Sequence, residues 1–232
     1  DTLTNKTLTS PKINEDVAVT STATELNLLD GKTATNLALT GKLGGTNFTN
    51  SLIVGHATTG TLNAADGNTA VGINAMDAIT TGDDNVVIGL NAGTAMTTAK
   101  RSVIIGHLAG TSLDTGFSNT AVGRNALPAG TSAHSNMALG QNALQAVNTG
   151  DYNLGIGRDS GNNITSGNGN VVIGQADVAS ATGDRQLSIS GFDGTNTTTW
   201  ISGDSDGDLT FAHDIFLADD SFIQFGGASE TI

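Results

Sequence analysis

The sequence predicts an all-β protein whose centre is a parallel β-solenoid, or β-roll, of about eight coils with 17 residues each. Glycines recur every 17 residues without insertion or deletion, a large aliphatic residue stands directly before each of them, and an asparagine or serine stands four residues before. A fixed period with fixed apolar positions is typical of stacked repeats. These ladder glycines are Gly55, Gly72, Gly89, Gly106, Gly123, Gly140, Gly157 and Gly174. Gly191 stands on the next step, although the residues around it fit less well.

Each repeat contains one stretch that favours a β-strand over a helix. Runs such as 85–89 and 102–106 are short, β-branched and terminated by glycine. Several are apolar at successive positions, which is typical of strands buried on both faces of a parallel sheet. The connecting halves, for example 75–84, carry the Gly, Asp, Asn and Thr that suit turns. We therefore expect each repeat to form one coil, whose strand pairs with its equivalent in the next coil.

The residues four positions before the ladder glycines predict a polar column. Stacking in register places one asparagine above another, so that their side chains can hydrogen-bond along the stack. The glycines are expected at bends that need a positive φ or a close backbone approach. The column contains Asn68, Asn85, Asn119, Asn136, Asn153 and Asn170, with Ser51 and Ser102 in the same slot. A second row of small residues predicts a second tight corner and consists of Gly82, Ala99, Gly116, Ala133, Gly150 and Gly167.

The segments on either side of the repeats have different sequence patterns. Residues 1–50 do not keep the 17-residue register and are expected to form a linker or fibre element, with a short helical stretch at 25–30. Residues 51–183 form the repeat array. Residues 184–232 are expected to be a β-rich cap or the next fibre module, because short alternating runs separated by Gly and Asp occur at 186–190, 197–202, 208–212 and 221–225.

Composition excludes several classes of protein. The net charge of −13 argues against a nucleic-acid partner, because phosphate binding needs a basic face. The absence of Cys excludes disulfides and Cys-based zinc sites. No apolar run approaches the ~20 residues needed to span a bilayer. Aliphatic residues dominate the hydrophobic fraction of 37%, since aromatics are only 4%, and small aliphatics suit a narrow lumen.

The His and Asp residues that could bind a metal ion are better explained by structural roles. His56 and His107 share the slot after the ladder glycine but lie three coils apart, so one chain cannot bring them to a single ion; only a three-fold axis could gather copies of one His. Asp204, Asp206 and Asp208 have the spacing of a calcium loop. However, Leu209 stands where that loop needs glycine, which favours a turn. We expect no metal and no cofactor.

Catalysis would require two carboxylates that face each other at about 5–10 Å, as in polysaccharide cleavage. The candidate carboxylates stand in turns rich in Gly and Asn, where Asp is expected for reasons of turn structure, and they are Asp83, Asp84, Asp114, Asp151 and Asp184. Only Phe117 and Tyr152 could stack on sugars within the array. The sequence therefore predicts a protein that is not an enzyme.

Two repeats carry a family resemblance. Residues 119–126, Asn-Thr-Ala-Val-Gly-Arg-Asn-Ala, and 136–143, Asn-Met-Ala-Leu-Gly-Gln-Asn-Ala, resemble the repeats of trimeric autotransporter adhesin heads, although the period here is longer. The same repeat style occurs in bacteriophage tail fibres, and segments 2–11 and 22–31 are similar to stretches of phage fibres, notably of marine cyanophages. The resemblance implies a left-handed β-roll assembled as a homotrimer.

Two apolar rows in each predicted strand suggest how such a trimer would form. The row before each glycine is always a large aliphatic, so we assign it to the lumen of the coil. The row two residues before each glycine is apolar but often small, and a bare apolar stripe is rare on soluble proteins. We therefore expect this second row to face the trimer axis; it consists of Ile53, Ala70, Val87, Ile104, Ala121, Ala138, Gly155 and Val172.

The resulting expectation is an extracellular structural segment of a virion: the shaft or receptor-adhesion part of a phage tail fibre that mediates host attachment. Its expected partners are copies of itself, other tail proteins, and a polysaccharide or protein receptor on the host. Membrane insertion is not expected. A bacterial trimeric adhesin head and a tailspike that degrades polysaccharide are the two alternatives.

Overall fold

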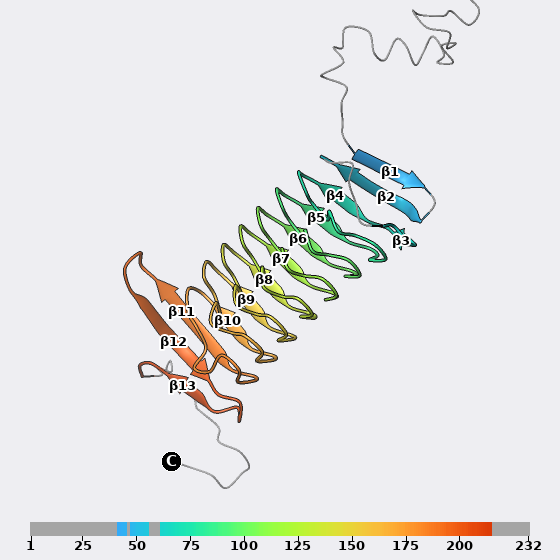
Figure 1. Ribbon diagram of the computed structural model, residues 1–232. Helices are drawn as coiled ribbons and strands as arrows, with labels where there is room; N and C mark the ends of the chain where they lie inside the picture. Colours follow the sequence, from blue (N-terminus) through green and yellow to red (C-terminus); the bar gives the residue numbers. More distant parts are fainter. Residues whose placement is uncertain (1–40, 46, 56–60, 215–232) are drawn as a thin grey trace, which may run out of the picture. The chain divides into compact units, whose positions relative to one another are not determined.

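The computed structural model describes residues 41–45, 47–55 and 61–214. Every regular element in this part of the chain is a β-strand, and the strands belong to a single sheet of 13 (Figure 1). The sheet is parallel through its centre and antiparallel at both ends. The predicted all-β parallel solenoid of about eight coils is confirmed. His56, the predicted helix at 25–30 and the predicted strand at 221–225 lie outside the described residues.

Each coil of the array contributes one short strand that pairs in parallel with the strands of the neighbouring coils. Paired residues of neighbouring coils are 17 positions apart in the sequence, since Val87 lies opposite Ile104 and Ile104 lies opposite Ala121. The strands are β2 (Phe48–Val54), β4 (Thr69–Val71), β5 (Val86–Ile88), β6 (Val103–Ile105), β7 (Thr120–Val122), β8 (Met137–Leu139), β9 (Leu154–Ile156) and β10 (Val171–Ile173).

Antiparallel strands extend the sheet at both ends of the array. At the N-terminal end, β1 (Gly41–Gly45) pairs with β2, and the short β3 (Ala65–Asp66) pairs in parallel with the start of β2. At the C-terminal end, β11 (Leu187–Phe192) continues the parallel array and then pairs antiparallel with β12 (Thr197–Gly203), which pairs with β13 (Leu209–Phe211). The predicted strands at 186–190, 197–202 and 208–212 are therefore present.

The last coil is one residue shorter than the others, and this corrects the assignment of Gly191. Gln186, rather than residue 187, occupies the polar slot after Asn170, because its backbone amide donates to Asn170 Oδ1 at 2.9 Å across 16 residues. Ser190 consequently lies opposite Gly174, as the pairing of Ile173 with Ile189 requires. Gly191 is thus displaced from the ladder by one position.

The interior of the coils reverses the prediction for the two apolar rows. The row two residues before each glycine does not face outward but lines the lumen, where Ala70, Val87, Ile104, Ala121, Ala138 and Val172 have no exposed surface and Ile53 has 1%. The row before the glycine, assigned to the lumen from sequence, lies on the outside. A single chain therefore buries the residues that were predicted to face a trimer axis.

Packing across the narrow lumen explains this reversal. Large side chains enter from the return half of each coil, and those with no exposed surface include Met76, Ile79, Met96, Leu113, Leu127, Leu144, Val147 and Ile164. Little room is left on the strand side. At Gly155, a Cβ atom would lie only 2.8 Å from Leu144 Cδ2. Where the strand residue is larger, as at Ile104, the opposing residue is Gly110. A Cβ atom added to Gly110 would lie 3.1 Å from Ile104 Cγ2.

Candidate functional site: the outer face of the coil stack

The ladder glycines form a column at the corner where each strand ends. From Gly72 to Gly140 they have φ of 138–139°, in the region that favours glycine. A Cβ atom on Gly123 would overlap the carbonyl oxygen of Gly140 and lie 2.6 Å from its carbonyl carbon. An added Cβ atom would meet the backbone of the next ladder residue in the same way at every position from Gly55 onward. At Gly157 the contact is longer, with the Gly174 carbonyl carbon at 3.1 Å, and at Gly174 the next residue is Ser190. Both sequence-based reasons for glycine, positive φ and close approach, therefore apply at one corner.

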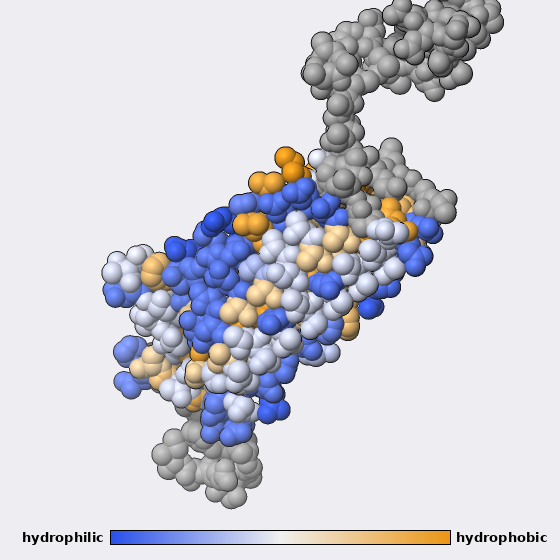
Figure 2. Space-filling view, in the orientation of Figure 1, coloured by the Kyte–Doolittle hydropathy of each residue, from blue (hydrophilic) through white to orange (hydrophobic). Residues whose placement is uncertain are grey.

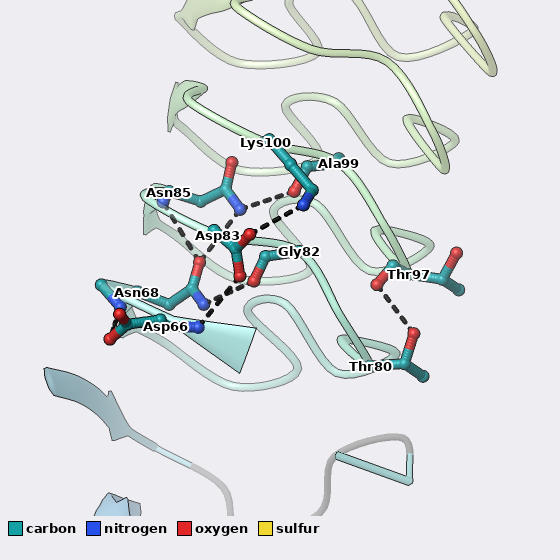
Figure 3. A network of polar contacts seen from close by, with 10 residues as sticks. Asp66, Asn68, Thr80, Gly82, Asp83, Asn85, Thr97, Ala99 and Lys100 are labelled. Carbon is teal, nitrogen blue, oxygen red and sulfur yellow. Dashed lines mark hydrogen bonds and ion pairs between the residues drawn. The ribbon is translucent and has the colours of Figure 1, made fainter. Parts of the chain in front are cut away.

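The polar column runs inside the stack, and its asparagines tie their coils to themselves and to neighbouring coils (Figure 3). Asn68 Nδ2 donates to the carbonyl of Gly82, 14 residues later, which closes its own coil. Asn68 Oδ1 accepts hydrogen bonds from the backbone amide and from Nδ2 of Asn85 in the next coil. Asn85 repeats the pattern toward Ala99. The small residues of the second predicted corner thus present the carbonyls that close the coils.

Outside the coils, the residues before the ladder glycines form a partly exposed aliphatic row. The exposed fraction is 39% at Val71, 38% at Ile88 and 45% at Leu139. Such exposure is unusual for large aliphatic side chains that repeat in every coil. This outer row consists of Val54, Val71, Ile88, Ile105, Val122, Leu139, Ile156 and Ile173.

A second outer row stands three residues before each ladder glycine and points to the same side of the sheet. It contains Val103, 36% exposed, and Met137, 45% exposed. Together the two rows form a surface that we call the outer face, and hydrophobic residues among polar ones are visible on the stack in Figure 2. The second row consists of Leu52, Thr69, Val86, Val103, Thr120, Met137, Leu154 and Val171.

The two edges of the outer face differ in chemistry. The residues that follow the ladder glycines form one edge: Ile73, Leu90, His107, Arg124, Gln141, Arg158 and Gln175. The residues two positions before the polar column form the opposite edge, which contains Asp83, Lys100, Phe117, His134 and Asp151. This second edge is held from coil to coil, for example by the ion pair of Lys100 with Asp83 at 2.7 Å and by the stacking of Phe117 on His134 at 4.0 Å.

Four of the five turn carboxylates considered as catalytic candidates serve as acceptors between neighbouring coils; Asp83 Oδ1, for example, accepts the backbone amide of Asp66 at 3.1 Å. Asp151 Oδ1 accepts the backbone amide of His134 at 2.7 Å, and Asp184 Oδ1 accepts that of Asn168 at 2.7 Å. The Asp114 carboxylate accepts the hydroxyl of Thr97. These side chains are thus occupied in holding the turns of adjacent coils in register.

The acidic stretch near residue 204 forms a turn. Asp204 Oδ1 accepts the backbone amides of Asp206 and Asp208, both at 3.0 Å. In the part of the chain that the structure describes, His107 is exposed, and no three His, Asp or Glu side chains gather in a group that could hold a metal ion. The same residues include no helix with the length and hydrophobicity to cross a membrane.

Comparisons with known proteins do not assign the chain to a family, because no family model, curated protein or solved structure matches it. The outer face is consequently the most prominent surface from which a function can be argued. The pattern of the strand alone predicts a lumen position for these aliphatic residues, and the structure places them outside. The signal that identifies them lies in the return half of the repeat, where Leu127 and Leu144 stand six residues after the small strand residues Ala121 and Ala138.

Proposed function

We propose that this chain is a segment of a homotrimeric bacteriophage tail fibre, which serves as a shaft or receptor-adhesion part during attachment to the host. The proposal rests on the resemblance of the repeats and of segments 2–11 and 22–31 to phage fibres. Such a segment belongs to the extracellular virion, where its partners are its own copies, other tail proteins and a host-surface receptor. Its role is structural and not enzymatic.

The observation that carries the self-association is the outer face. Leu139 and Met137 are both 45% exposed in one strand, and equivalent aliphatic pairs recur at β6 and β10. Large aliphatic side chains that stay exposed along one face of a stack are unusual on monomers and mark a surface that another molecule covers. A second copy of the same chain has the same 17-residue spacing, so that its rows match along the whole stack.

The edges of the outer face support a parallel, in-register arrangement. In a cyclic assembly, the edge after the ladder glycines would meet the opposite edge of the neighbouring chain. With no shift between chains, Arg158 would stand near Asp151, and Arg124 would stand near Phe117. A shift by one coil would instead bring Arg124 to His134. Favourable pairs therefore select the unshifted register.

Leu139→Asp is expected to dissociate the assembly. In a trimer with the outer face at its axis, three carboxylates would be brought close together in a dry environment, where they must protonate or separate. The mass measured by light scattering at micromolar concentration should fall from about three chains to one chain of 23.3 kDa. Gln145→Asp is the matched control, because Gln145 is an exposed residue on the return half of the same coil. A monomeric native chain would overturn the proposal.

A further inference from the structure

A cavity of about 350 Å³ lies on the hairpin of β11 and β12, beyond the last coil. It is lined by two aromatic residues, an acidic residue, an amide residue, a hydroxyl residue and a glycine, namely Gly191, Phe192, Asp193, Asn196, Thr198 and Trp200. All of these residues belong to one short stretch of one chain. The cavity is thus complete without any neighbouring copy.

Trp200, the only tryptophan of the chain, lies against the backbone of β11. A Cβ atom on Gly191 would stand 2.5 Å from Trp200 Cζ2, so only glycine lets the ring approach the strand this closely. Gly191 pairs with Thr198, two residues before Trp200, across the hairpin. Trp200 nevertheless remains 55% exposed, and Phe192 remains 41% exposed. The ring is therefore supported by the strand while much of its surface stays open.

The polar side of the cavity is fixed by the turn of the hairpin. Asp193 Oδ1 accepts the backbone amides of Thr195 and Asn196, each at 2.8 Å. Hydrogen bonds from the amides of Asn196 and then Thr195 lower the pKa of the Asp193 carboxyl below its usual value. The carboxylate is therefore an ionised acceptor at neutral pH, beside the side chains of Asn196 and Thr198.

We propose that this cavity binds a pyranose ring of a neutral or amino saccharide. The apolar C–H face of such a ring can pack on the indole of Trp200, and its hydroxyls can donate to Asp193 and exchange hydrogen bonds with Asn196 and Thr198. Small-molecule sites combine aromatic walls with a few oriented polar groups in this way. The ionised Asp193 disfavours anionic sugars by like-charge repulsion. The proposal deepens the receptor-adhesion role in the proposed function, on which it rests, by naming a class of ligand; it does not depend on self-association, which light scattering tests separately.

Trp200 itself reports on binding, because it can be excited selectively over the single tyrosine. Methyl glycosides of glucose, galactose, mannose and N-acetylglucosamine, titrated to about 100 mM, are expected to change its fluorescence with at least one dissociation constant in the millimolar range. Sorbitol, an acyclic polyol with similar hydroxyls, should cause no saturable change. A flat response to all four glycosides, or an equal response to sorbitol, would overturn the proposal.

Variants localise the effect. Asn196→Ala is expected to weaken binding about tenfold or more. Thr195→Ala, which changes a residue of the same turn outside the cavity, should leave binding unchanged. Trp200→Ala should abolish saturation-transfer NMR signals from the glycoside, whereas Tyr152→Ala, which removes another exposed aromatic ring, should retain them. Two results together would identify Trp200 as a subunit contact and refute the sugar site. The first is that acrylamide fails to quench the Trp200 fluorescence of the native assembly, and the second is that Trp200→Ala forms an assembly of lower mass in light scattering.

Discussion

Asn136→Ala is expected to lower the free energy of unfolding by about 3–5 kcal/mol, because the change removes four hydrogen bonds and leaves the Gly150 carbonyl and the Asn153 backbone amide without partners. Asn136 Nδ2 donates to Gly150 O at 2.8 Å and to Asn119 Oδ1 at 3.3 Å. Asn136 Oδ1 accepts the backbone amide of Asn153 at 2.8 Å and its Nδ2 at 3.1 Å. Each buried group that loses its only partner costs about 1–3 kcal/mol.

Chemical denaturation followed by circular dichroism, at a fixed chain concentration, measures this loss. The control is Asn142→Ala in the same coil. Asn142 also hydrogen-bonds to the equivalent residues of both neighbouring coils, Asn125 and Asp159, but it is only half-buried. Its removal should therefore cost about 1–2 kcal/mol, because water can replace the lost partners and alanine is less favourable than asparagine at the φ of 57° of this residue. Equal losses in the two variants would contradict the role assigned to the buried column.

Gly123→Val should destabilise the middle of the stack by about 2–6 kcal/mol per chain. A β-branched residue at φ 138° is strained by about 1–3 kcal/mol, and overlap of its side chain with the Gly140 carbonyl adds about 1–3 kcal/mol. The overlap cannot be relieved locally, because the obstructing atoms belong to the backbone of the next coil.

Thr120→Val is the matched control, since it introduces the same side chain three residues earlier on the outer face. Thr120 lies between Val103 and Met137 in the sheet, where a β-branched aliphatic residue is favourable. Thermal melting should fall for Gly123→Val and remain close to the native value for Thr120→Val. An unchanged melting temperature for Gly123→Val would be incompatible with the close corner.

The fold was predictable because one local rule repeats. An aliphatic residue before glycine, with asparagine three residues earlier, identifies both a strand and its terminating corner, and the period then fixes the register of Val87 with Ile104. Which side of the strand faces inward was not predictable from the strand alone, since both sides are apolar. Part of the missing information lies six residues later, where Ala121 is followed by Leu127 and Ile104 by Gly110. At Gly155 the rule fails, because Leu144 of the preceding coil fills the space instead.

The ends of the array were harder to predict, because the repeat rule no longer applies there. The one-residue shortening before Gln186 leaves the spacing of Gly174 and Gly191 at 17 in the sequence, although Ser190 takes the structural position opposite Gly174. The aromatic cavity at Trp200 depends on a hairpin register with an irregularity between Ile189 and Ser190. Sequence patterns indicated the strands but not which side chains they would bring together.

The constant separation of 17 residues between paired coils also has consequences for how the chain folds. Parallel sheets usually join strands that are far apart in sequence, which makes them slow to form because long loops must close first. Here, the hydrogen bonds from Asn136 to Asn119 and from Asn153 to Asn136 each close a loop of only 17 residues. Once a first pair of coils has formed, every further coil can add to an existing template at the same small entropic cost. Nucleation would then be the slow event, and growth would proceed along the stack by propagation, as in a helix–coil transition.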